Sequence, residues 1–199
     1  MVAFAAAALT LVLTDVQRLP LARPTLERAV AAALADSDLE LRWDTTPPGA
    51  GRPSSEGEVR VILLDTHPRS GKELVLGAVL RERAKALWVY VGDVHRVLKG
   101  TELGSSNPLQ LSIAVGRVIA HEIAHLVAPQ QPHTGEGLMS RIVDRRVLLQ
   151  ADAPLDAECR AAIRSAVAIR LGPALAAGVG TTFTIRAAGV DFGAGVVTR

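Results

Sequence analysis

The stretch NPLQLSIAVGRVIAHEIAHLVAP, residues 107–129, has the start, the periodicity and the stop of a helix. Asn107 is a favoured N-cap residue, and Pro108 follows at the first helical position. Proline has no amide hydrogen, but at this position the helix does not use one. Apolar residues then recur at helical spacing until Pro129, which cannot continue a helix. The pattern therefore predicts one long helix over residues 108–127.

The last turns of this helix carry His121, Glu122 and His125 in the order H-E-x-x-H. Residues four apart share one face of a helix, so both imidazoles can reach one ion. A zinc ion there would lower the pKa of a bound water and polarise a scissile carbonyl. Glu122 can take a proton from that zinc-bound water and pass it to the leaving amine. The motif predicts a metalloendopeptidase with one Zn²⁺ and with Glu122 as the catalytic residue.

A catalytic zinc needs a third protein ligand and one open position for water. The chain has a single cysteine, Cys159, so histidines and carboxylates must hold the metal. His133 is the favoured third ligand, because the QQP run at 130–132 can turn the chain back toward the helix. Glu136 is a rival, and Asp144 is a more distant alternative.

The segment HEIAHLVAPQQPHTGEGLM, residues 121–139, resembles the metzincin clan of zinc metallopeptidases. In that clan a helix with H-E-x-x-H is followed by a tight turn, a third ligand and a methionine turn under the metal. The segment is most similar to small bacterial relatives with a longer spacing to the third histidine and a Gly-Leu-Met or Gly-Ile-Met soon after it. The resemblance implies Glu122 as general base and Met139 as the supporting Met-turn residue. It implies three zinc ligands, His121, His125 and His133.

Two features depart from the clan's usual pattern. Ala128 stands where a glycine is usual three residues past the second histidine, and the spacing from His125 to His133 is longer than in the better-known families. The turn toward His133 is therefore expected to be built differently, with Pro129 and Pro132 shaping it.

The rest of the chain alternates short aliphatic runs with helical patterns and turn residues. Strands are predicted at 9–16, 39–43, 59–64, 74–80 and 86–91. Further helices are predicted at 24–34 and 155–171, with a helical turn at 93–98. This order predicts an α+β fold, in which a mixed, twisted sheet has helices packed on one face. A peptide substrate is expected to lie along an edge strand, supplied by 74–80 or 86–91.

The sequence predicts a single catalytic domain over residues 1–172, followed by a Gly- and Ala-rich tail, 173–199, with one weak strand, TTFTIR. The apolar run at 2–13 is too short to span a bilayer, so no stable membrane insertion is expected. It suits a first core strand better than a signal segment because it lacks a basic n-region, although residues 1–8 could be the remnant of one. The metzincin resemblance slightly favours a secreted or periplasmic location and leaves the cytoplasm open.

Lysine and arginine number 22 against 20 acidic residues, without a basic block, so no nucleic-acid partner is expected. The expected partner is a peptide or protein substrate, and the sequence does not indicate an oligomeric state. Two other classes remain. One is a metal-dependent endoribonuclease of the H-G-x-x-H type, against which Glu122 counts. The other is a zinc-binding module without catalytic activity.

Overall fold

The computed structural model describes residues 7–15, 19–44, 58–68, 74–80, 86–99, 107–170 and 183–187 of the chain. The strands are β1 (Ala7–Asp15), β2 (Leu39–Asp44), β3 (Glu58–Leu64), β4 (Leu74–Leu80), β5 (Ala86–Tyr90), β6 (Ile142–Val143) and β7 (Phe183–Ala187). The helices are α1 (Arg23–Ala33), α2 (Val91–Lys99), α3 (Pro108–Val127), α4 (Arg145–Leu148) and α5 (Ala157–Arg170).

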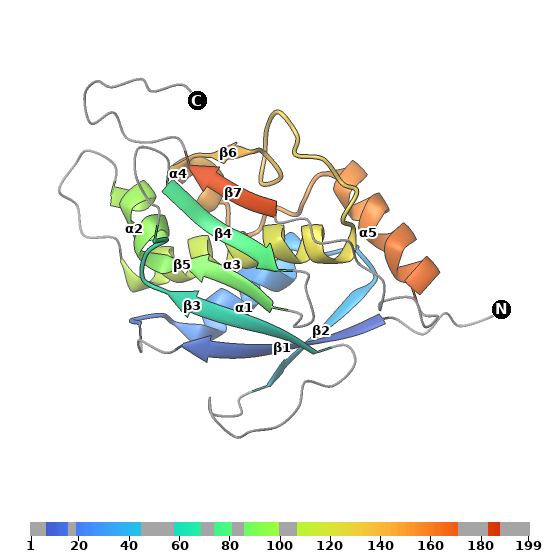
Figure 1. Ribbon diagram of the computed structural model, residues 1–199, viewed down its shortest axis with the longest axis horizontal. Coiled ribbons are helices and arrows are strands. Elements are labelled where there is room, and N and C mark those ends of the chain that lie inside the picture. The colour runs from blue at the N-terminus through green and yellow to red at the C-terminus, as the bar shows by residue number, and fades with distance from the viewer. Residues whose placement is uncertain are drawn as a thin grey trace.

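The strands form one mixed sheet in the order β2-β1-β3-β5-β4-β7-β6. The first four strands in this order are parallel to one another, whereas β4 runs antiparallel to both β5 and β7. The short β6 then runs parallel to β7. In Figure 1 the sheet twists from β2 to β6, and α1 and α3 lie along one of its faces. The α+β fold predicted from the sequence, a mixed sheet with helices on one face, is confirmed.

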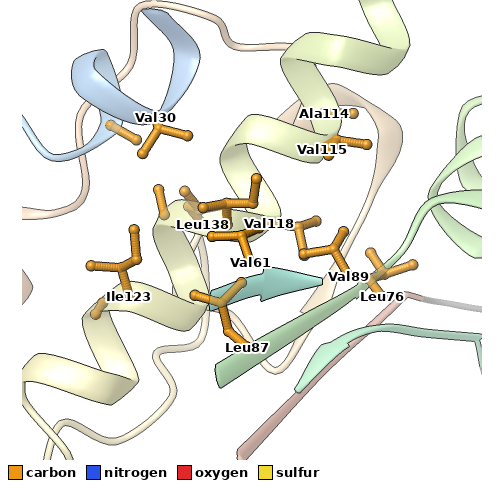
Figure 2. Close-up of a cluster of buried hydrophobic side chains, with 14 of the residues drawn as sticks. Val30, Val61, Leu76, Leu87, Val89, Ala114, Val115, Val118, Ile123 and Leu138 are labelled. Carbon is orange, nitrogen blue, oxygen red and sulfur yellow. The ribbon is translucent and has the colours of Figure 1, made fainter. Parts of the chain in front are cut away.

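The long helix α3 forms the centre of the core. Figure 2 shows Val118 and Ile123 of α3 among Val61, Leu87 and Val89 of the sheet, all fully buried. Each such side chain contributes roughly 1.5–3 kcal/mol when it leaves water. This packing fixes the helix that carries the H-E-x-x-H residues against the central strands.

The ends of the helices follow the signals in the sequence. The side chain of Asn107 accepts a hydrogen bond from the Leu109 amide at 2.8 Å and thereby caps α3. The helix ends at Val127, just before Pro129. After α1, Asp36 and Asp38 have φ values of 59° and 57°, a left-handed conformation that aspartate tolerates better than most residues.

The structure corrects the expectation that 74–80 or 86–91 forms a free sheet edge. β5 lies between β3 and β4, and β4 lies between β5 and β7. β4 is not an edge strand because residues 183–187, from the segment predicted as a weak strand, pair with it as β7. Residues 1–6, 171–182 and 188–199 lie outside the described part of the chain. None of the helices in the described ranges is long and apolar enough to cross a bilayer.

Candidate metal centre

Three imidazoles converge at the end of α3. His121 and His125 lie one turn apart on the helix and are fully buried, and half-buried His133 comes from the loop that follows. The Nε2 atom of His125 lies 3.0 Å from Nε2 of His121 and 3.2 Å from Nε2 of His133. The nitrogen atoms that the three rings offer all lie within 4.8 Å of one another.

Two of the three separations between these nitrogen atoms match what one zinc ion requires. Imidazole nitrogens at about 2.0–2.1 Å from a tetrahedral zinc stand roughly 3.3 Å apart. The two shorter Nε2 separations, 3.0 and 3.2 Å, are close to this value. Three neutral nitrogen donors leave the fourth tetrahedral position for water or substrate, which is the donor set of a catalytic zinc site. The residues present therefore fit the metal.

The backbone of Leu138 orients the first of these rings. Nδ1 of His121 lies 2.7 Å from the Leu138 carbonyl oxygen, which can only accept, so Nδ1–H donates and Nε2 keeps its lone pair. Burial, together with the neighbouring His125 ring, lowers the pKa of His121 well below its usual value. Such a ring stays neutral, which is the form that binds metals.

The loop after His133 is a closed turn that holds this carbonyl in place. The Thr134 amide donates to the Met139 carbonyl at 2.9 Å, and the Ser140 amide donates to the Gly137 carbonyl at 3.2 Å. Gly137 has a φ of 72°, which strongly favours glycine. Met139 is fully buried. The same turn thus ties the position of His133 to that of the carbonyl that orients His121.

Glu122 lies against the sheet, on the neighbouring side of the helix. Its side chain is fully buried, and a Cβ built on Gly77 of β4 would lie 2.6 Å from its Oε1 atom. Any residue other than glycine at position 77 would therefore collide with the carboxylate. Sequence reasoning missed Gly77, although a lone glycine in the strand LVLGAVL is a known sign of close backbone approach.

The two alternative ligands lie outside the cluster. Among the described residues, the group whose donor atoms converge consists of the three histidines alone. Glu136 is exposed on the turn, and the Asp144 side chain accepts from the Val147 amide at 2.8 Å as the N-cap of α4.

Burial and the charge of Arg141 lower the pKa of His133, so this third ring is also held neutral.

Two solved structures share the fold of this chain, one named a zinc-dependent peptidase and the other archaemetzincin. A zinc-dependent peptidase from Methanocorpusculum labreanum superposes with a TM-score of 0.53 at 13% identity, covering 78% of this chain and 99% of that one. Archaemetzincin from Methanopyrus kandleri superposes with a TM-score of 0.54 at 12% identity, covering 84% and 99%. No protein-family model and no curated protein sequence matches the chain. The chain therefore has the metzincin-like zinc peptidase fold.

Proposed function

We propose that the protein is a zinc-dependent endopeptidase that hydrolyses peptide bonds in peptides or proteins. The observation that carries this proposal is the convergence of three Nε2 atoms, two from α3 and one from the loop after it, while α3 also carries the buried Glu122. The metzincin-like fold and the zinc peptidases that share it support the same reading.

In this proposal His121, His125 and His133 hold one Zn²⁺, and Met139 supports the turn beneath it. The bound ion would lower the pKa of water and polarise the substrate carbonyl. The Leu138 carbonyl fixes the tautomer of His121, and the turn from Thr134 to Ser140 keeps that carbonyl and His133 together. The metal site therefore depends on a helix and one turn.

Glu122 acts as the general base and later as the acid. Its carboxylate takes a proton from the attacking water and donates it to the departing amine, so one residue serves both halves of the reaction. Burial between α3 and Gly77 restricts the motion of the side chain. Restricted motion favours proton transfer because the group is positioned before the substrate arrives.

The domain division is also a proposal. Residues 1–172 would form the catalytic domain, and 173–199 a C-terminal region that contributes β7 to the sheet. The endoribonuclease alternative gains no specific support from the described residues. A zinc-binding module without activity would share the three histidines but would have no need for Glu122.

The test compares zinc content and hydrolysis in wild-type protein and two variants. Elemental analysis of the full chain should give one zinc per molecule for wild type and for Glu122→Gln, since glutamine keeps size and shape but loses the basic carboxylate. Hydrolysis of casein or a peptide library should fall roughly 10²- to 10⁴-fold in this variant. His121→Ala should lose zinc and hydrolysis together.

Two results would overturn the proposal. A Glu122→Gln protein that kept a tenth of wild-type hydrolysis would exclude the general-base role. A wild-type protein with full zinc and no hydrolysis of any peptide would identify a binding module, and cleavage of RNA would support the endoribonuclease alternative.

A further inference from the structure

Strand β7 separates two elements that border the metal centre. It pairs antiparallel with β4 over Leu74–Val79, and parallel with β6 at Ile142 and Val143. In Figure 1 the red β7 lies between the green β4 and the orange β6, and α3 passes behind β4. A strand from the C-terminal region therefore fills the gap between β4 and β6.

Each neighbour of β7 is joined directly to the proposed catalytic machinery. β4 forms one wall beside the carboxylate, since a Cβ at Gly77 would lie 2.6 Å from Oε1 of Glu122. β6 begins two residues after Ser140, at the end of the turn that carries Leu138 and Met139. An extended peptide that paired with β4 beside Glu122 would have to lie between these two walls.

The register places β7 next to the reacting groups. Ile185 of β7 stands opposite Gly77, the position at which a Cβ would collide with the Glu122 carboxylate. Neighbouring strands in a sheet are about 4.8 Å apart, so the backbone at Ile185 is one strand spacing from Gly77. An extended peptide paired with β4 at this point would occupy the same place.

Pairing with β4 is exclusive. The outer edge of β4 presents one row of amide and carbonyl groups, and a second strand can use that row only when the first has left it. Peptides commonly bind enzymes and receptors by adding a strand to such an edge. In this structure β7 already makes that addition, antiparallel to β4 and parallel to β6.

The pairing also contains an irregularity beside the site. The register between β4 and β7 shifts between Val75 and Gly77, so Leu76 has no direct counterpart in the ladder. Bulges of this kind disrupt local pairing and are frequent next to active sites. On its other side β7 pairs with β6 at two positions only, which is the shortest pairing between strands in the described part of the chain.

We propose that β7 is an intrasteric strand that occupies the substrate-binding edge of β4 and must be displaced before a peptide can bind. This proposal rests on the peptidase function proposed above. The apparent affinity for substrate then equals the intrinsic affinity multiplied by the fraction of molecules in which β7 is displaced. If β7 is displaced in one molecule in a hundred, abolishing its pairing with β4 raises kcat/KM about a hundredfold.

The first experiment weakens β7 in the full-length protein with Ile185→Pro and Arg186→Pro together. Amides of adjacent strand residues point to opposite edges, so one of the two prolines removes an amide on the β4 side. The matched control, Ile185→Ala with Arg186→Ala, keeps both amides. We expect faster hydrogen exchange in β4 and at least a tenfold rise in kcat/KM for the proline variant, with zinc content unchanged and the alanine control like wild type.

Three results distinguish the possible failures. Faster exchange in β4 without a gain in kcat/KM would overturn the intrasteric role while leaving peptidase function intact. Unchanged protection of β4 in the proline variant would overturn the pairing on which the role depends. Zinc-loaded wild type and variants that all fail to hydrolyse any peptide would overturn the peptidase proposal and this one together.

A second variant covers the case in which two prolines unfold the sheet. Ala78 and Thr184 stand directly opposite each other, and facing Cβ atoms in antiparallel pairs are about 4.5–5.5 Å apart, near disulfide geometry. In Ala78→Cys with Thr184→Cys, oxidation should lock β7 and lower kcat/KM at least tenfold, and a phosphine reductant should restore it. The two single-cysteine variants are the controls. An oxidised, disulfide-bonded protein as active as its reduced form would overturn the proposal.

Discussion

Gly77 and Glu122 lie so close together that position 77 has no room for a side chain. A Cβ on Gly77 would lie 2.6 Å from Oε1 of Glu122, and 2.9 Å from Cγ1 of Val118. Real Cβ atoms essentially never show non-bonded contacts under 3.0 Å, so a Cβ here would force its neighbours to shift. The glycine therefore lets the strand and the helix close around the carboxylate and sets where Glu122 can lie.

The first prediction is that Gly77→Ala impairs catalysis without removing the metal. The added methyl group should displace the Glu122 carboxylate, so kcat/KM should fall tenfold or more, as small misplacements of reacting groups commonly do. Overpacking should also lower the free energy of unfolding by about 1–3 kcal/mol. Peptidase kinetics, elemental analysis and urea unfolding measure the three effects.

Gly135→Ala is the matched control for this variant. A Cβ on Gly135 would have no heavy atom within 4 Å, so its activity and stability should be those of wild type. A Gly77→Ala protein with wild-type kcat/KM would show that the position of Glu122 does not depend on this contact.

The second prediction concerns Arg117, which lies one turn before His121 on α3 and is 1% exposed. Its Nη1 group donates to the carbonyls of Gln150 and Ala153, both at 2.6 Å. Burial lowers the pKa of Arg117 to about 10, so the guanidinium stays charged at neutral pH. Arg117→Met keeps much of the volume but removes both donors, and should lower the free energy of unfolding by about 1.5–3 kcal/mol.

Urea unfolding of the Arg117→Met protein measures this loss, and zinc content should stay at one ion per chain because no ligand is touched. Arg117→Lys keeps a positive charge but cannot reproduce the geometry of the guanidinium, so its free energy of unfolding should lie between those of Arg117→Met and wild type. Equal stability of the methionine variant and wild type would show that these two hydrogen bonds contribute nothing net.

The local signals in the sequence predicted the elements well, because capping and breaking residues act within a few positions. Asn107 and Pro129 bound α3 as expected, and the His121 and His125 spacing was sufficient to bring two imidazoles together. His133 reaches the cluster because its loop folds back onto the helix, as the proline-containing turn suggested.

The remaining features depend on contacts between distant segments. The weak strand at 183–187 has little local preference, and only its pairing with β4 makes it part of the sheet. The hydrogen bond from His121 ends on the Leu138 carbonyl, a backbone group that every residue has and that leaves no trace in the sequence. Gly77 is visible in the sequence as a lone glycine in a strand, but only the packing of β4 on α3 shows that Glu122 is its neighbour.

The third prediction is that Cys159 is unreactive in the folded protein. The side chain is fully buried, and burial, with smaller effects from Asp156 and Glu158, raises the pKa of its thiol to about 12. A thiol reagent such as DTNB should therefore fail to label native protein at pH 8 and label it fully in guanidinium, since the thiolate is the reactive form. Rapid labelling of native protein would contradict the burial of this helix face.

The same shift predicts a loss of stability at alkaline pH. The unfolded thiol ionises near pH 8.5, whereas the folded thiol keeps its proton to about pH 12, so the folded state binds more protons in this window. Stability then falls as pH rises through the window, by at most about 1.4 kcal/mol per pH unit from this group. Cys159→Ala should remove that contribution, which paired denaturation curves at pH 8 and 10.5 would detect.

The last prediction separates the third ligand from its rival. His133→Ala removes one of three converging nitrogens, and two ligands hold zinc poorly, so zinc affinity should fall tenfold or more. Glu136→Ala changes an exposed residue of the same turn, outside the cluster of ligand atoms, so zinc affinity should stay within a factor of two of wild type. Competition with a chromogenic chelator measures both affinities, and circular dichroism checks that both variants fold. The opposite pattern, with Glu136→Ala weakening zinc and His133→Ala leaving it unchanged, would reassign the ligand. Because His133 and Leu138 belong to one turn, losing the metal should also loosen that turn, so hydrogen exchange at residues 134–140 should rise in His133→Ala and not in Glu136→Ala.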